Sequence, residues 1–114
     1  MKQKNGVIRS KIYGISKHQE AIDDLNNGDE LVLKREPNNS YDKNAIQIHS
    51  KSGKILGYVK AEIAADLAKQ IDKNFSVRCR VLMITGQAYK NKGVNIEYVC
   101  AAFDSANDQF QGVM

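Results

Sequence analysis

Hydrophobic and polar residues alternate along most of this chain, and that alternation is typical of short β-strands with one buried face. It predicts strands at residues 7–15, with Ile8 and Ile12 on one face, and at residues 55–59. Four more strands are predicted around Leu31 and Leu33, around Ile46 and Ile48, at Val77, Cys79, Val81 and Met83, and at Val94, Ile96, Tyr98 and Cys100. The polar residues 50–53 indicate a turn, and residues 87–93 indicate a hairpin loop.

Two segments have helical spacing instead. Ile63, Leu67 and Ile71 recur every four residues, so a helix at residues 61–71 should bury one stripe. A shorter helix is predicted at residues 16–25, because Ser16 and Gln19 fit a capping box and an Asn-Asn-Gly run follows. From residue 104 onward the apolar periodicity is lost, so we expect a flexible tail there.

These elements predict a mainly β fold with two helices, in the α+β class. Parallel sheets need crossover helices between most strands, whereas four of these strands form two apparent hairpins. We therefore expect a mostly antiparallel, strongly curved six-stranded sheet that closes partly into a small barrel. A chain of 114 residues suits one domain. We place it at residues 7–103, after an N-terminal extension at 1–6 and before the tail at 104–114.

The formal net charge of +4 and the pI of about 9.1 point mildly towards polyanionic partners. Cys79 and Cys100 lack CxxC spacing, so we interpret them as buried thiols of a reducing cytoplasm. No apolar run approaches the roughly 20 residues of a membrane span, and residues 1–5 precede no signal-peptide core. We therefore expect a soluble, cytoplasmic protein without membrane contact. The oligomeric state stays open.

A polar loop follows Leu33 and contains the only proline of the chain. Pro37 fixes φ near −65°, and the Asn-Asn-Ser run behind it favours turns, so we expect one defined loop shape. The loop presents an aromatic ring, a carboxylate and two amides beside cations, a set suited to gripping a nucleotide. These side chains belong to Tyr41, Asp42, Asn39 and Asn44, with Lys34, Arg35 and Lys43 alongside.

Four segments together resemble the HIRAN domain family: Gly14-Ile15-Ser16, then GDELVLKREPNN at residues 28–39, YDKNAI at 41–46 and LGYV at 56–59. The resemblance covers residues 7–103. This family is found at the N-terminus of some SNF2-type DNA-remodelling helicases and as free-standing bacterial proteins. The resemblance implies an OB-like barrel that captures the 3′ end of single-stranded DNA, with an aspartate on the terminal hydroxyl and aromatic rings on the end bases.

The resemblance assigns the hydroxyl-binding role to Asp42, the adjoining aromatic to Tyr41 and a polar contact with the DNA backbone to Asn39. A carboxylate suits this task because it accepts a charge-assisted hydrogen bond from a hydroxyl and repels a phosphate. The residues alone leave a second interpretation open, in which Asp42 forms an Asx turn or caps a strand.

Departures from the family pattern concern the stretch after Gly14. Helicase members have an arginine and aromatic residues there, whereas this chain has Ser16-Lys17-His18. His18 could stack on a base and Lys17 could meet a phosphate, or both could form the exposed first turn of a helix. Tyr58 and Lys60 are further candidate DNA contacts, with a strand-end tyrosine and a solvated lysine as the alternative.

Catalytic arrangements are missing from the sequence. His18, His49, Glu36 and the cysteines form no HxxxH, CxxC or GxSxG pattern, and no Walker A run occurs. We therefore expect no catalytic residue, metal or cofactor, and any ATP-driven remodelling would require another polypeptide. A helicase or nuclease is a candidate partner protein. The resemblance implies a module that recognises single-stranded DNA ends in repair, replication or remodelling. The alternative is a protein-interaction domain that keeps the barrel without the DNA grip.

Overall fold

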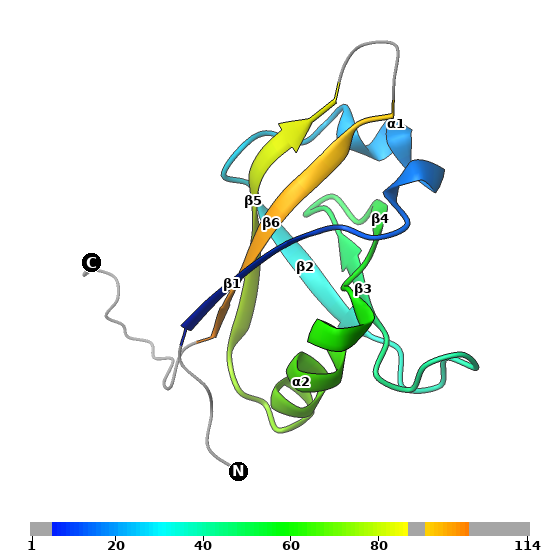
Figure 1. Ribbon diagram of the computed structural model, residues 1–114, viewed down its shortest axis with the longest axis vertical. Helices are drawn as coiled ribbons and strands as arrows, with labels where there is room; N and C mark the ends of the chain where they lie inside the picture. The colour runs from blue at the N-terminus through cyan, green and yellow to red at the C-terminus, as the bar shows by residue number, and fades with distance from the viewer. Residues whose placement is uncertain (1–5, 87–90, 101–114) are drawn as a thin grey trace.

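The computed structural model describes residues 6–86 and 91–100, which form a curled six-stranded sheet with helices packed on it (Figure 1). The strands are β1 (Gly6–Lys11), β2 (Glu30–Arg35), β3 (Ile46–His49), β4 (Ile55–Tyr58), β5 (Val77–Thr85) and β6 (Gly93–Cys100). Their order in the sheet is β1-β6-β5-β2-β3-β4, and every neighbouring pair is antiparallel. The predicted mainly β, antiparallel architecture is confirmed. Residues 104–114 and most of the predicted 87–93 loop lie outside the described residues.

The two edges of this sheet meet just after β1 ends. Tyr13 forms an isolated bridge with Tyr58, with backbone hydrogen bonds of 2.9 and 2.8 Å in the two directions. The first strand therefore ends at Lys11 rather than at residue 15. The Ile12 amide still bonds the Val94 carbonyl of β6 at 3.1 Å, and Tyr13 then pairs with β4 instead. This bridge turns an open sheet into a partly closed barrel.

Gly57 makes that closure possible. Its φ is +153°, and a Cβ at this position would lie 2.3 Å from the carbonyl oxygen of Tyr13 and 2.7 Å from Cγ2 of Ile12. Only a residue without a side chain lets the two edges approach so closely. The glycine of the LGYV segment is therefore required by its contact with Ile12 and Tyr13, which lie outside its own strand.

A buried cluster of side chains fills the barrel. The hydrophobic residues without measurable exposure come from β3, β4, the long helix and β6, and they are Ile46, Ile48, Leu56, Leu67, Val94, Ile96 and Tyr98. The helix α2 (Ala61–Asp72) contributes Ala64, Leu67 and Ala68 to the core, as its four-residue spacing predicts. Ile63 and Ile71 pack at the margin of the same cluster.

The first helix differs from its prediction. Gly14, at φ +77°, leads into a 3-10 turn, η1 (Ile15–Lys17), and the α-helix α1 covers only Gln19–Ile22. The capping box is wrong, because the side chain of Gln19 instead bonds the backbone of Lys92 at 2.7 and 2.9 Å. Tertiary contact with the chain entering β6 thus replaces local capping. Ala21, Ile22 and Leu25 are nevertheless buried, as expected.

Strand β5 also departs from simple alternation. Cys79 and Val81 face the core, but a register shift between Val81 and Met83 leaves Met83 54% exposed. A bulge of this kind inserts a residue and reverses the face of those that follow it. The predicted inward position of Met83 is therefore wrong.

Both cysteines are buried, as predicted. Burial raises the pKa of the Cys79 thiol to about 12, so this thiol stays protonated and unreactive at neutral pH. None of the helices in the described part of the chain is long and apolar enough to span a bilayer.

Candidate nucleic-acid interface

The segment between β2 and β3, residues 36–45, projects from the body of the molecule beside α2 (Figure 1). We call it the 36–45 loop. Its two ends are joined by a hydrogen bond from the Glu36 amide to the Ala45 carbonyl, 2.9 Å long. Turns follow at each side, from the Asn39 amide to the Glu36 carbonyl at 3.0 Å and from the Ala45 amide to the Asp42 carbonyl at 3.1 Å. The loop has one defined shape, as its Pro-Asn-Asn-Ser sequence predicts.

Asn39 organises the tip of this loop. Its side-chain oxygen accepts hydrogen bonds from the amides of Tyr41, at 2.8 Å, and Asp42, at 3.0 Å. Its side-chain nitrogen donates to Oε1 of Glu36 at 2.9 Å. Both ends of the Asn39 side chain therefore hold the loop together, and its contact with a DNA backbone stays a prediction.

Glu36 connects the loop to the barrel. The same Oε1 that receives Asn39 also accepts the Tyr58 hydroxyl proton at 2.9 Å. The Tyr58 oxygen in turn accepts from Nε2 of Gln47 at 3.2 Å, and Oε1 of Gln47 lies 2.7 Å from Nε2 of His49. A continuous chain of polar contacts thus runs from the loop tip across β4 and β3.

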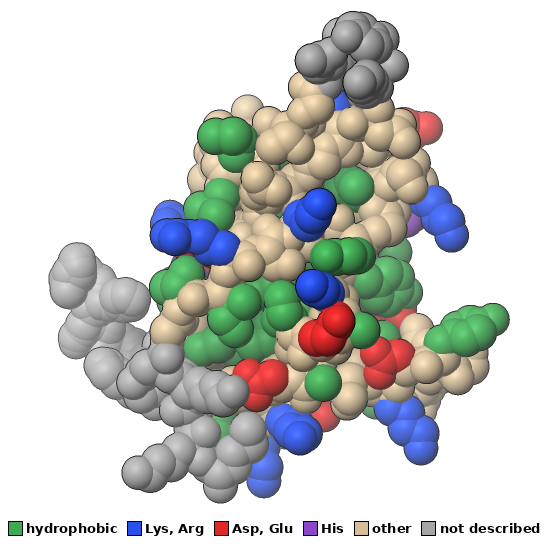
Figure 2. All heavy atoms as spheres, in the orientation of Figure 1, with side chains coloured by type: hydrophobic (Ala, Val, Ile, Leu, Met, Phe, Trp, Pro, Cys, Tyr) green, Lys and Arg blue, Asp and Glu red, His purple; other side chains and the backbone are tan. Residues whose placement is uncertain are grey.

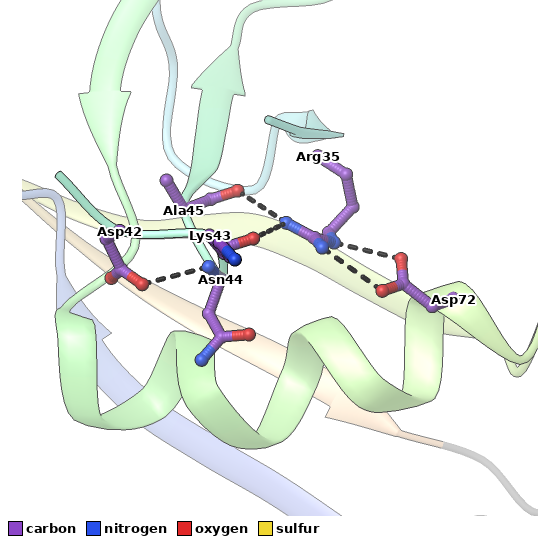
Figure 3. A network of polar contacts seen from close by, with 6 residues as sticks. All are labelled: Arg35, Asp42, Lys43, Asn44, Ala45 and Asp72. Atoms are coloured by element: carbon purple, nitrogen blue, oxygen red, sulfur yellow. Dashed lines mark hydrogen bonds and ion pairs between the residues drawn. The ribbon is translucent and has the colours of Figure 1, made fainter. Parts of the chain in front are cut away.

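Arg35 braces the other side of the loop. Its guanidinium lies between the carboxylate of Asp72, at the end of α2, and the carbonyl oxygens of Lys43 and Ala45 (Figure 3). The two bonds to Asp72 are 2.9 and 3.1 Å long, and those to the carbonyls are both 3.0 Å. Hydrogen bonding to Arg35 holds the pKa of Asp72 below its usual value, so this ion pair persists at neutral pH. Arg35 is thus committed to structure rather than available to a ligand.

Tyr41 and Asp42 occupy the tip that these two braces hold. The Tyr41 side chain is 97% exposed, so its ring is no part of the core. Oδ1 of Asp42 accepts the Asn44 amide at 2.8 Å, which is the Asx turn that the residues alone allowed. No described residue bonds the second oxygen, Oδ2. Because a carboxylate has about four acceptor sites, the turn leaves Asp42 able to accept a further hydrogen bond.

A row of outward-facing side chains crosses the sheet at the foot of the loop. Lys34 of β2 pairs with Gln47 of β3, Gln47 pairs with Tyr58 of β4, and Tyr58 pairs with Tyr13. Directly opposed residues in antiparallel strands place their side chains on the same face. We call Lys34, Gln47, Tyr58 and Tyr13 the cross-strand row. It combines a cation, an amide and two phenol rings on one surface.

The remaining predicted residues lie around this row. Lys17 is exposed at the end of η1, and His18, half-buried, precedes α1; both helical segments contact β4. Lys60 is half-buried and caps the start of α2, two residues beyond Tyr58. The fold therefore brings the stretch after Gly14 towards the same strand as Tyr58, although the two are about 40 residues apart in the sequence.

The cations of the described residues divide into two groups. Ion pairs with acidic side chains involve Arg9, Arg35, Lys54, Arg78, Arg80 and Lys92. The described lysines outside these pairs are Lys11, Lys17, Lys34, Lys43, Lys51, Lys60, Lys69 and Lys73. Half of them, Lys17, Lys34, Lys43 and Lys60, lie on the loop, in the row or beside it. Figure 2 shows Lys and Arg side chains standing apart on the face it presents, without one continuous basic patch. Phosphate attraction should therefore be local and moderate.

Among residues 6–86 and 91–100, no three His, Cys, Asp or Glu side chains gather into a metal site. The exposed groups of the loop and row can instead donate and accept hydrogen bonds, stack and attract anions.

Three residues of this surface escaped the sequence analysis. Glu36 and Gln47 act through partners on other strands, and their spacing along the chain carries no signal of those contacts. Tyr13 did have a signal, because Ile8 and Ile12 facing inward put Tyr13 on the outer face.

Replacing Glu36 by Ala should loosen the tip of the loop. The Asn39 amide and the Tyr58 hydroxyl would lose their common acceptor, and each such bond contributes about 0.5–1.5 kcal/mol. We expect hydrogen exchange at the Tyr41 and Asp42 amides to become about tenfold faster, while Ile48 in the core keeps its protection. Unchanged exchange at Tyr41 would show that Glu36 does not hold the loop.

The model of the family described as the HIRAN domain matches residues 5–101. The chain belongs to the HIRAN family. Curated relatives are the helicase-like transcription factors of Oryctolagus cuniculus, 38% identical over 71 residues, and Homo sapiens, 34% identical over 71 residues. The matched segment is 62% of this chain but only 7% of the length of each relative.

Solved HIRAN structures share the barrel. The crystal structure of the HIRAN domain of human HLTF has a TM-score of 0.68 and 27% identity, covering 83% of this chain and 74% of that one. An NMR structure of the HLTF HIRAN domain in its DNA-bound conformation has a TM-score of 0.62 and 27% identity, covering 82% of this chain and 73% of that one. The crystal structure of a protein from Lactobacillus plantarum is 18% identical and has a TM-score of 0.64, so it shares the fold. The match covers 84% of this chain and 99% of that one. The expected OB-like HIRAN barrel is confirmed.

Proposed function

We propose that this HIRAN domain is a non-catalytic DNA-binding module that recognises single-stranded DNA at its 3′-hydroxyl end. The observation that carries the proposal is the braced loop tip, where the exposed Tyr41 ring stands next to a carboxylate with one uncommitted oxygen. The DNA-bound conformation of a HIRAN domain with 27% identity supports a nucleic-acid ligand. Asp42 would accept the terminal hydroxyl and Tyr41 would stack on the end base.

The charges around the tip are consistent with a short site. Lys43 lies on the loop, Lys34 lies in the row at its foot, and Lys17 and Lys60 lie near the row, so a few phosphates could be neutralised at once. Asn39 would act mainly by shaping the tip, and His18 would add a ring at the periphery. We further propose that the module works in the cytoplasm beside a helicase or nuclease, in DNA repair, replication or remodelling.

Binding should be salt-dependent but not steeply so. On a single strand, the logarithm of affinity falls with a slope of about −0.7 per neutralised phosphate. We expect a slope of only a few units for a short oligonucleotide with a free 3′ end, measured by fluorescence anisotropy. Lys43→Gln should reduce the slope by about 0.7, because it removes one such contact.

Lys51→Gln is the matched control. Lys51 is an equally exposed lysine in the β3–β4 turn, at the opposite end of β3 from the loop, so its loss changes net charge but no proposed contact. Affinity that ignores salt, or equal slopes for the two variants, would contradict the proposed site. A folded domain that binds no oligonucleotide would favour the protein-interaction alternative.

A further inference from the structure

Tyr13 is one of the two tyrosines at the seam of the barrel, and this residue is 40% exposed. It is held there by backbone atoms alone, through the paired bonds of 2.9 and 2.8 Å with Tyr58. Ile12, its neighbour, is buried in the core, so Tyr13 points to the outer face. The backbone hydrogen bonds of the seam therefore hold Tyr13 at the surface, and its side chain is not needed for them.

The neighbours of Tyr13 place this ring beside the proposed site. Opposed residues of an antiparallel bridge share a face, so Tyr13 lies next to Tyr58. The Tyr58 hydroxyl reaches Glu36, the first residue of the 36–45 loop. Lys34 and Gln47 form the other end of the cross-strand row. Lys34 is one residue before the end of β2, where the loop begins, and Gln47 is one residue after the start of β3, where the loop ends. The row thus runs along the foot of the loop that carries Tyr41 and Asp42.

We propose that Tyr13 is a second base-stacking residue, which takes a nucleotide upstream of the 3′-terminal one. This inference rests on the proposed function of the loop. Tyr58 is less suited to that task, because Glu36 and Gln47 occupy its hydroxyl and it is half-buried. Tyr13 is exposed and has no such side-chain bonds in the described residues, and Lys34, at the opposite end of the row, supplies an exposed cation on the same face. Aromatic rings for the bases and cations along the backbone are the usual means of holding a single strand without reading its sequence.

The length of the oligonucleotide separates the two rings. Tyr41 should act on the terminal base and so matter for every length, whereas Tyr13 should matter only when upstream nucleotides are present. We would compare Tyr13→Leu, Tyr13→Phe and Tyr41→Leu on 3′-hydroxyl oligonucleotides of about two and about eight nucleotides. Leucine keeps apolar bulk and removes the ring, and the bridge to Tyr58 uses only backbone atoms, so thermal unfolding should confirm that Tyr13→Leu is folded.

Tyr13→Leu should weaken binding of the long oligonucleotide by about 5- to 100-fold and leave the dinucleotide unaffected. Tyr13→Phe should bind like the wild type, and the preference for a 3′-hydroxyl over a 3′-phosphate should survive in both. Wild-type affinity of Tyr13→Leu for the long oligonucleotide, with Tyr41→Leu weakened, would overturn this inference and leave the proposed function intact. A wild-type domain that binds neither length would overturn the proposed function itself.

Discussion

Gly57→Ala should destabilise the domain severely. The new Cβ would overlap the carbonyl oxygen of Tyr13, at 2.3 Å, and would also force an L residue to adopt a φ of +153°. Backbone strain and overpacking each cost about 1–3 kcal/mol, so we expect a loss of about 2–6 kcal/mol in the free energy of unfolding. Since small domains are stable by only about 5–15 kcal/mol, urea titration should show a large fall in the midpoint, or an unfolded protein.

Gly53→Ala is the matched control for that experiment. Gly53 lies in the β3–β4 turn with a φ of +95°, but nothing stands within 4 Å of its ideal Cβ position. This variant should therefore bear the backbone strain without the clash. The difference between the two variants isolates the close approach of the barrel edges. Equal urea midpoints for the two variants would contradict the close approach of Gly57 to Tyr13 at the seam.

Asp42→Asn should reduce affinity for a 3′-hydroxyl end by about tenfold, because a hydrogen bond to a charged acceptor is stronger than one to a neutral amide. The fold of the loop should survive, since an Asn side chain can still accept the Asn44 amide that Asp42 now accepts at 2.8 Å. The variant should also discriminate less against a 3′-phosphate, because the repelling charge is gone. Parallel titrations with both oligonucleotides measure the two effects.

Glu62→Gln provides the control for net charge. Glu62 is exposed in the first turn of α2, and neutralising it changes the charge of the protein by the same unit. It should leave the ratio of affinities for the two ends unchanged. If Glu62→Gln shifts that ratio as much as Asp42→Asn does, the effect is general electrostatics and Asp42 has no special role.

Local sequence patterns predicted those parts of the fold that local contacts decide. The apolar stripe of α2 and the alternation of β3 and β6 could be predicted, because each of these regular elements buries one face. Local patterns did not predict the end of β1, the capping of α1 or the side of β5 on which Met83 lies, because tertiary contacts decide these features. Tyr13 leaves β6 for β4, Gln19 bonds Lys92, and a bulge in β5 reverses its alternation.

The candidate site divides in the same way. The shape of the loop was predictable from Pro37 and the residues behind it, and the exposed Tyr41 and the Asx turn of Asp42 follow from that local chemistry. Its attachment to the barrel was not predictable, since Glu36 meets Tyr58 across 22 positions and Arg35 meets Asp72 across 37. Such contacts are fixed by strand order, which no short motif encodes.

One measurement tests the central claim most directly: the affinity of the wild-type domain for one short single strand presented in three forms. The forms are a free 3′-hydroxyl, a 3′-phosphate and a covalent circle of the same sequence. If Asp42 accepts the terminal hydroxyl, the phosphate adds charge beside a carboxylate and removes the donor, while the circle offers no end. We expect the free end to bind about tenfold or more tightly than either other form. Equal affinity for all three would contradict end recognition.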